Sequence, residues 1–317
     1  MRLEGKSVMV TGASGFIGSH LAERLLESNN LVVAYDSFDE FYQGKEKNLE
    51  KCLSNSSFKL CKSDILDFES LAKTMSDVDV VFHLAAQPGV RFSTLNPWKT
   101  NAINVDGTLN VLLASAKSSV GKVVFASSSS VYGMAKQLPC SEEQPTFPIS
   151  VYGASKLAGE NYCLTFFRSL GLPVTILRYH TVYGPRQRPD MAIYKFTKAV
   201  HENTPPIIYG DGKQTRDFTY VSDAVEGTIL AAEKEKSTGQ IFNIGSGSPV
   251  TVNDVVGMLI RIMGKKGIQP IYQDTKSGDV EHTYADIRKA VDILGYKPKT
   301  NIKEGLKDFV GWYETCV

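Results

Sequence analysis

The chain opens its first apolar run at Ser7-Val8-Met9-Val10 and continues directly into Thr11-Gly12-Ala13-Ser14-Gly15-Phe16-Ile17-Gly18. The run predicts a short strand, and the recurrence of Ile17, Leu21 and Leu25 every four residues predicts an amphipathic helix after it. Glycines between a strand and a helix let the backbone approach a pyrophosphate, which the free N–H groups of the helix N-terminus attract. The stretch therefore predicts a dinucleotide site formed by Gly12, Gly15, Phe16, Ile17 and Gly18.

Acidic residues follow the next two predicted strands. Asp36 closes the strand predicted at Leu31–Tyr35, and we group Ser37 with it. A carboxylate at that point accepts hydrogen bonds from ribose hydroxyls and repels a 2′-phosphate, which favours NAD over NADP. Asp64 and Ile65 follow the third predicted strand, where they would meet the adenine; the spacing is equally consistent with Asp64 as a helix cap.

Strand and helix patterns alternate over the first 180 residues. Apolar runs predict strands at 58–60, 78–84, 122–126 and 174–177, and helical patterns lie near 67–75, 97–118 and 152–170. This alternation predicts an α/β fold, a doubly wound parallel Rossmann-type sheet, because strand–helix–strand crossovers are right-handed. Glycine and proline residues interrupt this pattern after residue 180.

After residue 180 the regular alternation of strand and helix patterns gives way to segments interrupted by glycine and proline. This change predicts a second, smaller α/β substrate lobe, mostly C-terminal. We expect residues 1–182, with about 216–246, to form the NAD-binding domain. The lobe would contain about 183–215 and 247–317, with helices at Thr251–Met263, Ala285–Leu294 and Ile302–Tyr313.

Composition excludes several classes of protein. Among 317 residues, 35 Lys and Arg balance 34 Asp and Glu, so no broad basic field favours nucleic acid or a membrane surface. No apolar run approaches the length of a membrane span, and no signal-like segment opens the sequence. The five cysteines show no CxxC or metal-ligand spacing. These observations predict a cytoplasmic protein with free thiols and no metal.

Tyr152 and Lys156 are four residues apart in a predicted helix, so their side chains share one face. A free tyrosine, with a pKa of about 10, is a poor general base at neutral pH. An ammonium about 4 Å away would favour the phenolate by roughly 4 kcal/mol at an effective dielectric constant of about 20, before desolvation. We therefore expect Lys156 to lower the pKa of Tyr152, which would then accept and donate a proton near pH 7.

A cluster of hydroxyls follows a predicted strand in the segment Ala126-Ser127-Ser128-Ser129-Ser130-Val131-Tyr132-Gly133. Ligands bind at the carboxyl ends of strands in open α/β sheets, and hydroxyls there can hydrogen-bond a sugar hydroxyl or a carboxylate. A serine-rich turn without a ligand is the alternative.

Thr11–Gly18, His83-Leu84-Ala85-Ala86, Ser128 and the Tyr152/Lys156 pair together resemble the extended short-chain dehydrogenase/reductase family, over essentially the whole chain. The resemblance implies catalytic roles for Ser128, Tyr152 and Lys156 and a nucleotide sugar in the second lobe. It also implies a homodimer. Around the NAD cofactor it places Leu84, Ala85, Ala86, Asn104, Tyr152, Lys156 and Tyr179.

Two segments, Gln87–Arg91 and Thr181–Ala192, are similar to those of UDP-glucuronate 4-epimerases. The resemblance implies conversion of UDP-glucuronate to UDP-galacturonate through a transient 4-keto sugar. A UDP-glucose/UDP-galactose 4-epimerase and then a UDP-glucuronate decarboxylase (UDP-xylose synthase) are the alternatives. The implied substrate-binding residues are Gln87, Arg91, Ser128, Ser129, Ser130, Thr181, Arg186, Asp190, Ile208, Tyr209, Arg216 and Asp279.

Two departures from related enzymes bear on the reaction. Related decarboxylases carry glutamate where this chain has Ser130, and related 4,6-dehydratases carry an Asp-Glu pair in place of Ser129 and Ser130. Their absence disfavours dehydration and, less strongly, decarboxylation. A non-catalytic NAD-sensing regulator is disfavoured because such relatives tend to lose the tyrosine or the lysine. The resemblance implies that Arg216 binds the UDP phosphates, whereas Lys276 stands where relatives often have arginine.

Overall fold

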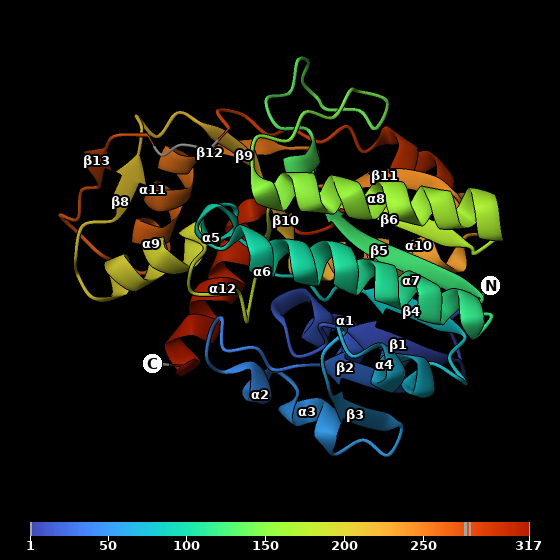
Figure 1. Cartoon of the computed structure of the whole chain (residues 1–317). Helices are drawn as coiled ribbons and strands as arrows, with labels where there is room; N and C mark the ends of the chain where they lie inside the picture. The colour runs from blue at the N-terminus through green and yellow to red at the C-terminus, as the bar shows by residue number, and fades with distance from the viewer. Residues whose placement is uncertain (1, 276–277, 279, 317) are drawn as a thin grey trace.

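A seven-stranded sheet forms the centre of the protein in a computed structural model that describes residues 2–275, 278 and 280–316 (Figure 1). Every neighbouring pair of its strands is parallel, in the order β11-β6-β5-β4-β1-β2-β3. The predicted doubly wound Rossmann-type sheet is therefore confirmed. Its strands are β1 (Ser7–Thr11), β2 (Leu31–Asp36), β3 (Phe58–Lys62), β4 (Val80–His83), β5 (Lys122–Ser128), β6 (Val174–Tyr179) and β11 (Gln240–Ile244).

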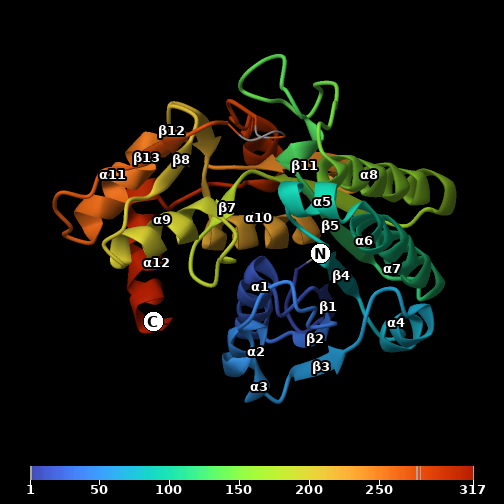
Figure 2. The ribbon, with the colours of Figure 1, turned by 60° about the vertical axis from the view of Figure 1, so that its left-hand side comes forward.

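Helices cover both faces of this sheet (Figure 2). Val8 and Val10 of β1 pack under α1 (Phe16–Glu27) and α10 (Val221–Glu233), whereas Met9 faces the opposite layer. That layer contains α4 (Phe68–Thr74), α7 (Gly107–Lys117) and α8 (Val151–Leu170). A strand buried on both faces reads as a continuous apolar run, which is why Val8–Val10 shows no alternation of polar and apolar residues.

The predicted helix at 97–118 consists of three segments: α6 (Pro97–Asn101), the π-helix η1 (Ala102–Asp106) and α7. A π-helical turn inside an α-helix often marks a functional site. Short elements complete the sheet domain: α2 (Lys45–Asn48), α3 (Glu50–Leu53), α5 (Val90–Leu95) and the 3₁₀ turns η2 (Ser129–Val131) and η3 (Glu235–Ser237).

A separate apolar core joins α9 (Ala192–His201), α11 (Val252–Ile262) and α12 (Ile302–Cys316), at the left of Figure 1. Phe196, Leu259 and Phe309 are buried where these helices meet. Three short strand pairs surround them: β8 (Ile207–Tyr209) with β13 (Ile271–Gln273), β9 (Thr215–Asp217) with β12 (Pro249–Thr251), and β7 (Val182–Tyr183) with β10 (Thr219–Tyr220).

The segment expected to form a lobe helix at Ala285–Leu294 differs from the prediction. Ala285 pairs with Cys140 in a parallel bridge and donates its N–H to the buried Asp217, so the backbone is extended there. The π-helix η4 spans Ala290–Leu294, and Ala290 and Leu294 pack in the core of the sheet domain with α10. The predicted helix is therefore wrong at Ala285, and the helical part, Ala290–Leu294, packs against the sheet domain and not in the lobe core.

Within the part of the chain described, no helix is long and apolar enough to cross a bilayer. The same residues contain no group of three or more His, Cys, Asp or Glu side chains arranged to hold a metal ion.

Candidate active site

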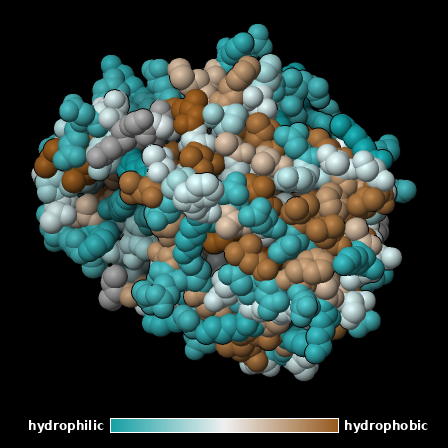
Figure 3. Space-filling model, viewed as in Figure 1, coloured by the Kyte–Doolittle hydropathy of each residue, from teal (hydrophilic) through white to brown (hydrophobic). Residues whose placement is uncertain are grey.

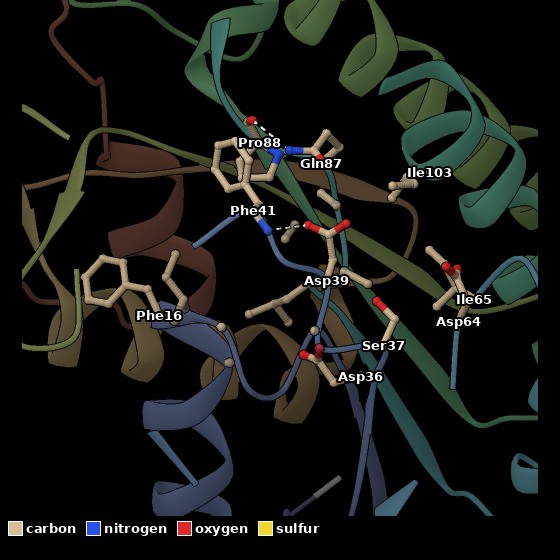
Figure 4. A pocket seen from close by; sticks show the side chains of 18 of the residues that line it. Phe16, Asp36, Ser37, Asp39, Phe41, Asp64, Ile65, Gln87, Pro88 and Ile103 are labelled. Carbon is tan, nitrogen blue, oxygen red and sulfur yellow. Dashed lines mark hydrogen bonds between the residues drawn. The ribbon is translucent and has the colours of Figure 1, made fainter. Parts of the chain in front are cut away.

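A cavity of about 380 Å³ opens at the carboxyl ends of β1, β2, β3, β4, β5 and β6 (Figure 4). Loops at this edge of a parallel sheet form the ligand sites of doubly wound folds. Most of the predicted cofactor residues line it: Gly12, Gly15, Phe16, Ile17, Gly18, Asp36, Ser37, Asp64, Ile65, Leu84, Ala85, Ala86, Tyr152, Lys156 and Tyr179.

The glycine turn is closely packed against its neighbours. Gly12 has a φ of +71°, and a Cβ added there would lie 2.7 Å from the backbone nitrogen of Ala85. A Cβ on Gly18 would lie 2.2 Å from the carbonyl oxygen of Gly12. Helix α1 begins after Gly15 without a side-chain cap, so the first N–H groups of the helix remain available to an anion.

Asp36 is held at the end of β2 with its carboxylate beside the cavity, as Figure 4 shows. Its two oxygens accept hydrogen bonds from the N–H groups of Ser14, at 2.9 Å, and Phe38, at 2.8 Å. A carboxylate oxygen has more than one lone pair, so Asp36 can still accept hydrogen bonds from ribose hydroxyls.

Residues 37–44 form the β2–α2 loop, which sequence reasoning missed apart from Ser37. Asp39, Phe41 and Tyr42 of this loop line the cavity, together with Lys45 at the start of α2. The hydroxyl of Tyr42 is buried with no hydrogen-bond partner among the described residues, and burial raises its pKa to about 12. A ligand with polar groups would satisfy that hydroxyl.

Asn104 does not line this cavity, although the resemblance placed it beside the cofactor. It lies buried in η1, where its side-chain amide exchanges two hydrogen bonds with the backbone of Gln87, at 2.7 and 3.1 Å. It also donates to the Ser155 hydroxyl at 2.9 Å. Asn104 therefore joins the loop after β4, which does line the cavity, to the first turn of α8.

Tyr152 and Lys156 both line the first cavity from α8, as their spacing predicted. Lys156 is 3% exposed and donates to the Ala126 carbonyl at 2.8 Å, and burial lowers its pKa to about 8. The net shift at Tyr152 is opposite to the expected one: burial raises the pKa of Tyr152, while Arg188 and a hydrogen bond from Ser128 act to lower it. Desolvation of the phenolate is the larger effect.

Arg188 is the cation that the site prediction left out. It lines the first cavity and pairs with Asp190 at 2.9 Å, and its guanidinium carbon is 5.8 Å from the centre of the Phe41 ring. The resemblance named Arg91, Arg186 and Arg216, and the sequence carries no signal that Arg188 acts on Tyr152.

A second cavity of about 150 Å³ lies beyond the serine cluster. Its lining includes Ser129, Ser130, Thr181 and Arg216, so four predicted substrate residues are brought together from η2, the loop after β6 and strand β9. Ser128 lines neither cavity, although Ser127 lines the first and Ser129 lines the second. Its hydroxyl accepts from the Ser130 N–H and donates to the Ser130 hydroxyl, both at 3.1 Å, and interaction with Ser128 acts to lower the pKa of Tyr152.

The other predicted substrate residues have different surroundings. Gln87 lines the first cavity. The guanidinium of Arg91 lies over the Tyr209 ring, 5.0 Å from its centre. Arg186 pairs with Glu23 of α1 at 2.6 Å and lines neither cavity, and Asp190 is engaged with Arg188. Ile208 is 1% exposed in the lobe core, and Asp279 lies outside the described residues.

A buried ion pair lies next to the catalytic helix. Glu160 of α8 receives two hydrogen bonds from Arg178 of β6, at 2.9 and 2.7 Å. The Ser127 hydroxyl donates to the same carboxylate at 2.5 Å. The network fixes α8 against the carboxyl ends of β5 and β6, one helical turn after Lys156.

The fold and site define the class of protein: a dinucleotide-dependent α/β enzyme with a tyrosine–lysine pair beside the cofactor cavity and a polar pocket next to it. The family model described as the NAD dependent epimerase/dehydratase family matches residues 8–245. The chain belongs to that family, which confirms the predicted resemblance and its NAD dependence.

Individual relatives match over nearly their whole length. The UDP-glucuronate 4-epimerase of Thermodesulfobacterium geofontis is 39% identical over 313 residues, covering 96% of this chain and 95% of that one. "Uncharacterized UDP-glucose epimerase YtcB" of Bacillus subtilis is 41% identical over 309 residues, covering 96% and 97%. The crystal structure of the Bacillus cereus UDP-glucuronic acid 4-epimerase with UDP-glucuronic acid and NAD superposes with a TM-score of 0.93, at 39% identity and 98% and 100% coverage.

Proposed function

We propose that the protein is an NAD-dependent isomerase that inverts C4 of a UDP-sugar, converting UDP-glucuronate to UDP-galacturonate through a transient 4-keto sugar. The observation that carries the proposal is the position of Tyr152 and Lys156 in the cofactor cavity, where Ser127 also lies, while Ser129 and Ser130 of the same serine segment line the second cavity. The relatives' names and the ligands of the Bacillus cereus structure support a UDP-sugar.

The first cavity fits a dinucleotide. The uncapped start of α1 suits the pyrophosphate, Asp36 suits a ribose, and the buried Tyr42 hydroxyl lacks a partner within the described residues. When bound, NAD supplies reversible hydride acceptance, so that C4 is oxidised and then reduced without an external oxidant.

The chain's own residues handle the proton. Tyr152 takes the proton of the C4 hydroxyl as C4 becomes a ketone, and returns it to the oxygen after the sugar has turned. Because burial disfavours the phenolate, this step depends on nearby positive charge and hydrogen bonds. Arg188 and the Ser128 hydroxyl supply them, and Lys156 lines the same cavity.

The second cavity favours a carboxylate at C6 of the sugar. Ser129, Ser130 and Thr181 bring three hydroxyl donors to its lining. A carboxylate in such a pocket would cost several kcal/mol if left unpaired, so donors are required. Positions 129 and 130 carry no acid, which argues against dehydration and against assisted decarboxylation.

The test is to incubate NAD-loaded protein with UDP-glucuronate and, separately, with UDP-glucose, and to resolve the products. We expect UDP-galacturonate as the main product. Equal or faster turnover of UDP-glucose would instead assign a UDP-glucose/UDP-galactose 4-epimerase, and CO₂ as the main product a decarboxylase. Tyr152→Phe should lower turnover by about 10²–10⁴-fold with NAD still bound. Tyr272→Phe, at an exposed tyrosine of β13 that lines neither cavity, is the control.

We further propose that the protein is a homodimer. Large apolar side chains are exposed on neighbouring helices: Leu95 on α5, Trp98 on α6, Leu113 on α7 and Tyr162 on α8. Figure 3 shows apolar residues gathered on the face over these helices. A contiguous apolar face of this kind is typical of an interface between subunits. A cytoplasmic location is proposed from the five free cysteines, which suit a reducing compartment.

A further inference from the structure

Three consecutive side chains of α5 contact three different parts of the protein. Arg91 lies over Tyr209 of β8, Phe92 packs edge-to-face on Phe41 of the β2–α2 loop, and Ser93 hydrogen-bonds the catalytic helix. Helix α5 begins directly after the loop that lines the cofactor cavity. Helix α5 therefore connects strand β8 of the lobe, the loops that line the cofactor cavity and the catalytic helix α8.

The contact to α8 is made at the backbone of the catalytic residue. The Tyr152 N–H donates to the Ser93 hydroxyl oxygen at 3.0 Å. The Ser93 proton is committed elsewhere, because the hydroxyl donates to the Val90 carbonyl at 2.7 Å, so its oxygen acts as an acceptor toward Tyr152. Ser93 is fully buried, and water cannot take its place without a rearrangement.

This hydrogen bond satisfies a donor that the helix itself leaves free. The first N–H groups of an α-helix have no intrahelical acceptor. Ser150, the N-cap of α8, accepts from Gly153, and its carbonyl accepts from Ala154. The N–H of Tyr152 is supplied with an acceptor by Ser93 from another element, which fixes the rotation of the first turn of α8 and hence the direction of the phenol.

The other two contacts hold α5 in place. The guanidinium carbon of Arg91 is 5.0 Å from the centre of the Tyr209 ring, within the range of a cation–π contact. The rings of Phe92 and Phe41 are 5.1 Å apart at 82°, the geometry preferred by aromatic pairs. Both contacts restrain α5, so that Ser93 presents its oxygen to Tyr152 at a fixed point.

We propose that Ser93 is a positioning residue for proton transfer at Tyr152. In this proposal, α5 sets the position of the phenol relative to the cofactor cavity and to strand β8 of the lobe. The inference rests on the proposed function, in which Tyr152 exchanges the proton of the C4 hydroxyl. Loss of the Ser93 hydroxyl leaves a buried N–H unpaired, and the first turn of α8 must shift to satisfy it.

The test compares Ser93→Ala with Thr94→Ala. Thr94 is the matched control because its hydroxyl donates to the same Val90 carbonyl, at 3.3 Å, but its side chain is exposed, whereas Ser93 is buried. With turnover counted per bound NAD, we expect Ser93→Ala to lower kcat about tenfold and to change KM for the UDP-sugar less than twofold. Hydrogen exchange at the Tyr152 amide should become faster in Ser93→Ala and stay unchanged in Thr94→Ala.

The possible results distinguish failure of this inference from failure of the proposed function. An unchanged kcat in Ser93→Ala, or a lower kcat without faster exchange at the Tyr152 amide, overturns the inference. If Ser93→Ala does not fold, Ser93→Thr retains the hydroxyl and should keep kcat close to wild type; slow turnover of the threonine variant overturns the inference as well. Wild-type protein that epimerises no UDP-sugar overturns the proposed function instead, and this is established before any variant is compared.

Discussion

At the scale of single residues, the charge of Arg188 is expected to control the pH at which Tyr152 works. Arg188 lowers the pKa of Tyr152 against the larger effect of burial. Neutralising it in Arg188→Gln should therefore raise the pKa of Tyr152 further and move the acidic limb of the kcat/KM profile to higher pH. The measurement is the pH dependence of kcat/KM between pH 5.5 and 9.5.

Arg186→Gln provides the control for this change. Arg186 lies two residues earlier in the same loop but pairs with Glu23 and lines neither cavity. It should leave the acidic limb where it is in the wild-type protein. Equal shifts in both variants would mean that the loop responds to the loss of any arginine, and Arg188 would lose its specific role.

At the scale of elements, the ion pair between α8 and β6 is expected to carry much of the stability of the catalytic edge. Glu160→Leu would leave the Arg178 guanidinium charged and unpaired at 4% exposure of its side chain. Removing one partner of a buried pair costs about 3–5 kcal/mol of unfolding free energy, whereas replacing both partners is often close to neutral. Denaturant unfolding of Glu160→Leu and of Glu160→Leu/Arg178→Met, at one fixed NAD concentration, measures the difference.

The exposed pair between Lys198 and Glu202 of the lobe serves for comparison. Glu202→Gln should unfold almost as the wild-type protein does, because exposed pairs add little. A double variant as unstable as Glu160→Leu alone would show that packing of the two side chains, and not the unpaired charge, accounts for the loss.

Some features of the fold and of the site are predictable from the sequence, and others depend on contacts between distant segments. The glycine turn and the Tyr152/Lys156 pair were predictable because each depends on neighbours within about one helical turn. Arg186 and Arg188 could not be told apart, since both are loop arginines and only the contact with Glu23 directs one of them away. Ala285–Leu294 has a helical apolar spacing, but which core it enters depends on packing between distant segments. The raised pKa of Tyr152 likewise depends on burial, which charge spacing alone does not give.

At the scale of the whole molecule, the last prediction concerns assembly. Trp98 is 87% exposed on α6, one of the four helices of the proposed interface, and large aromatic residues dominate the binding energy of interfaces. If two copies pair through this face, Trp98→Glu should weaken the dimer by at least about 2 kcal/mol, roughly thirtyfold in dissociation constant. Sedimentation equilibrium over a range of concentrations measures it. Leu53→Glu tests a second exposed apolar residue, 57% exposed on α3, and should leave the dimer intact. Because α5 and α8 also carry Ser93 and Tyr152, the proposed interface would lie on the helices that position the phenol. A wild-type protein that sediments as a monomer would contradict the proposed dimer.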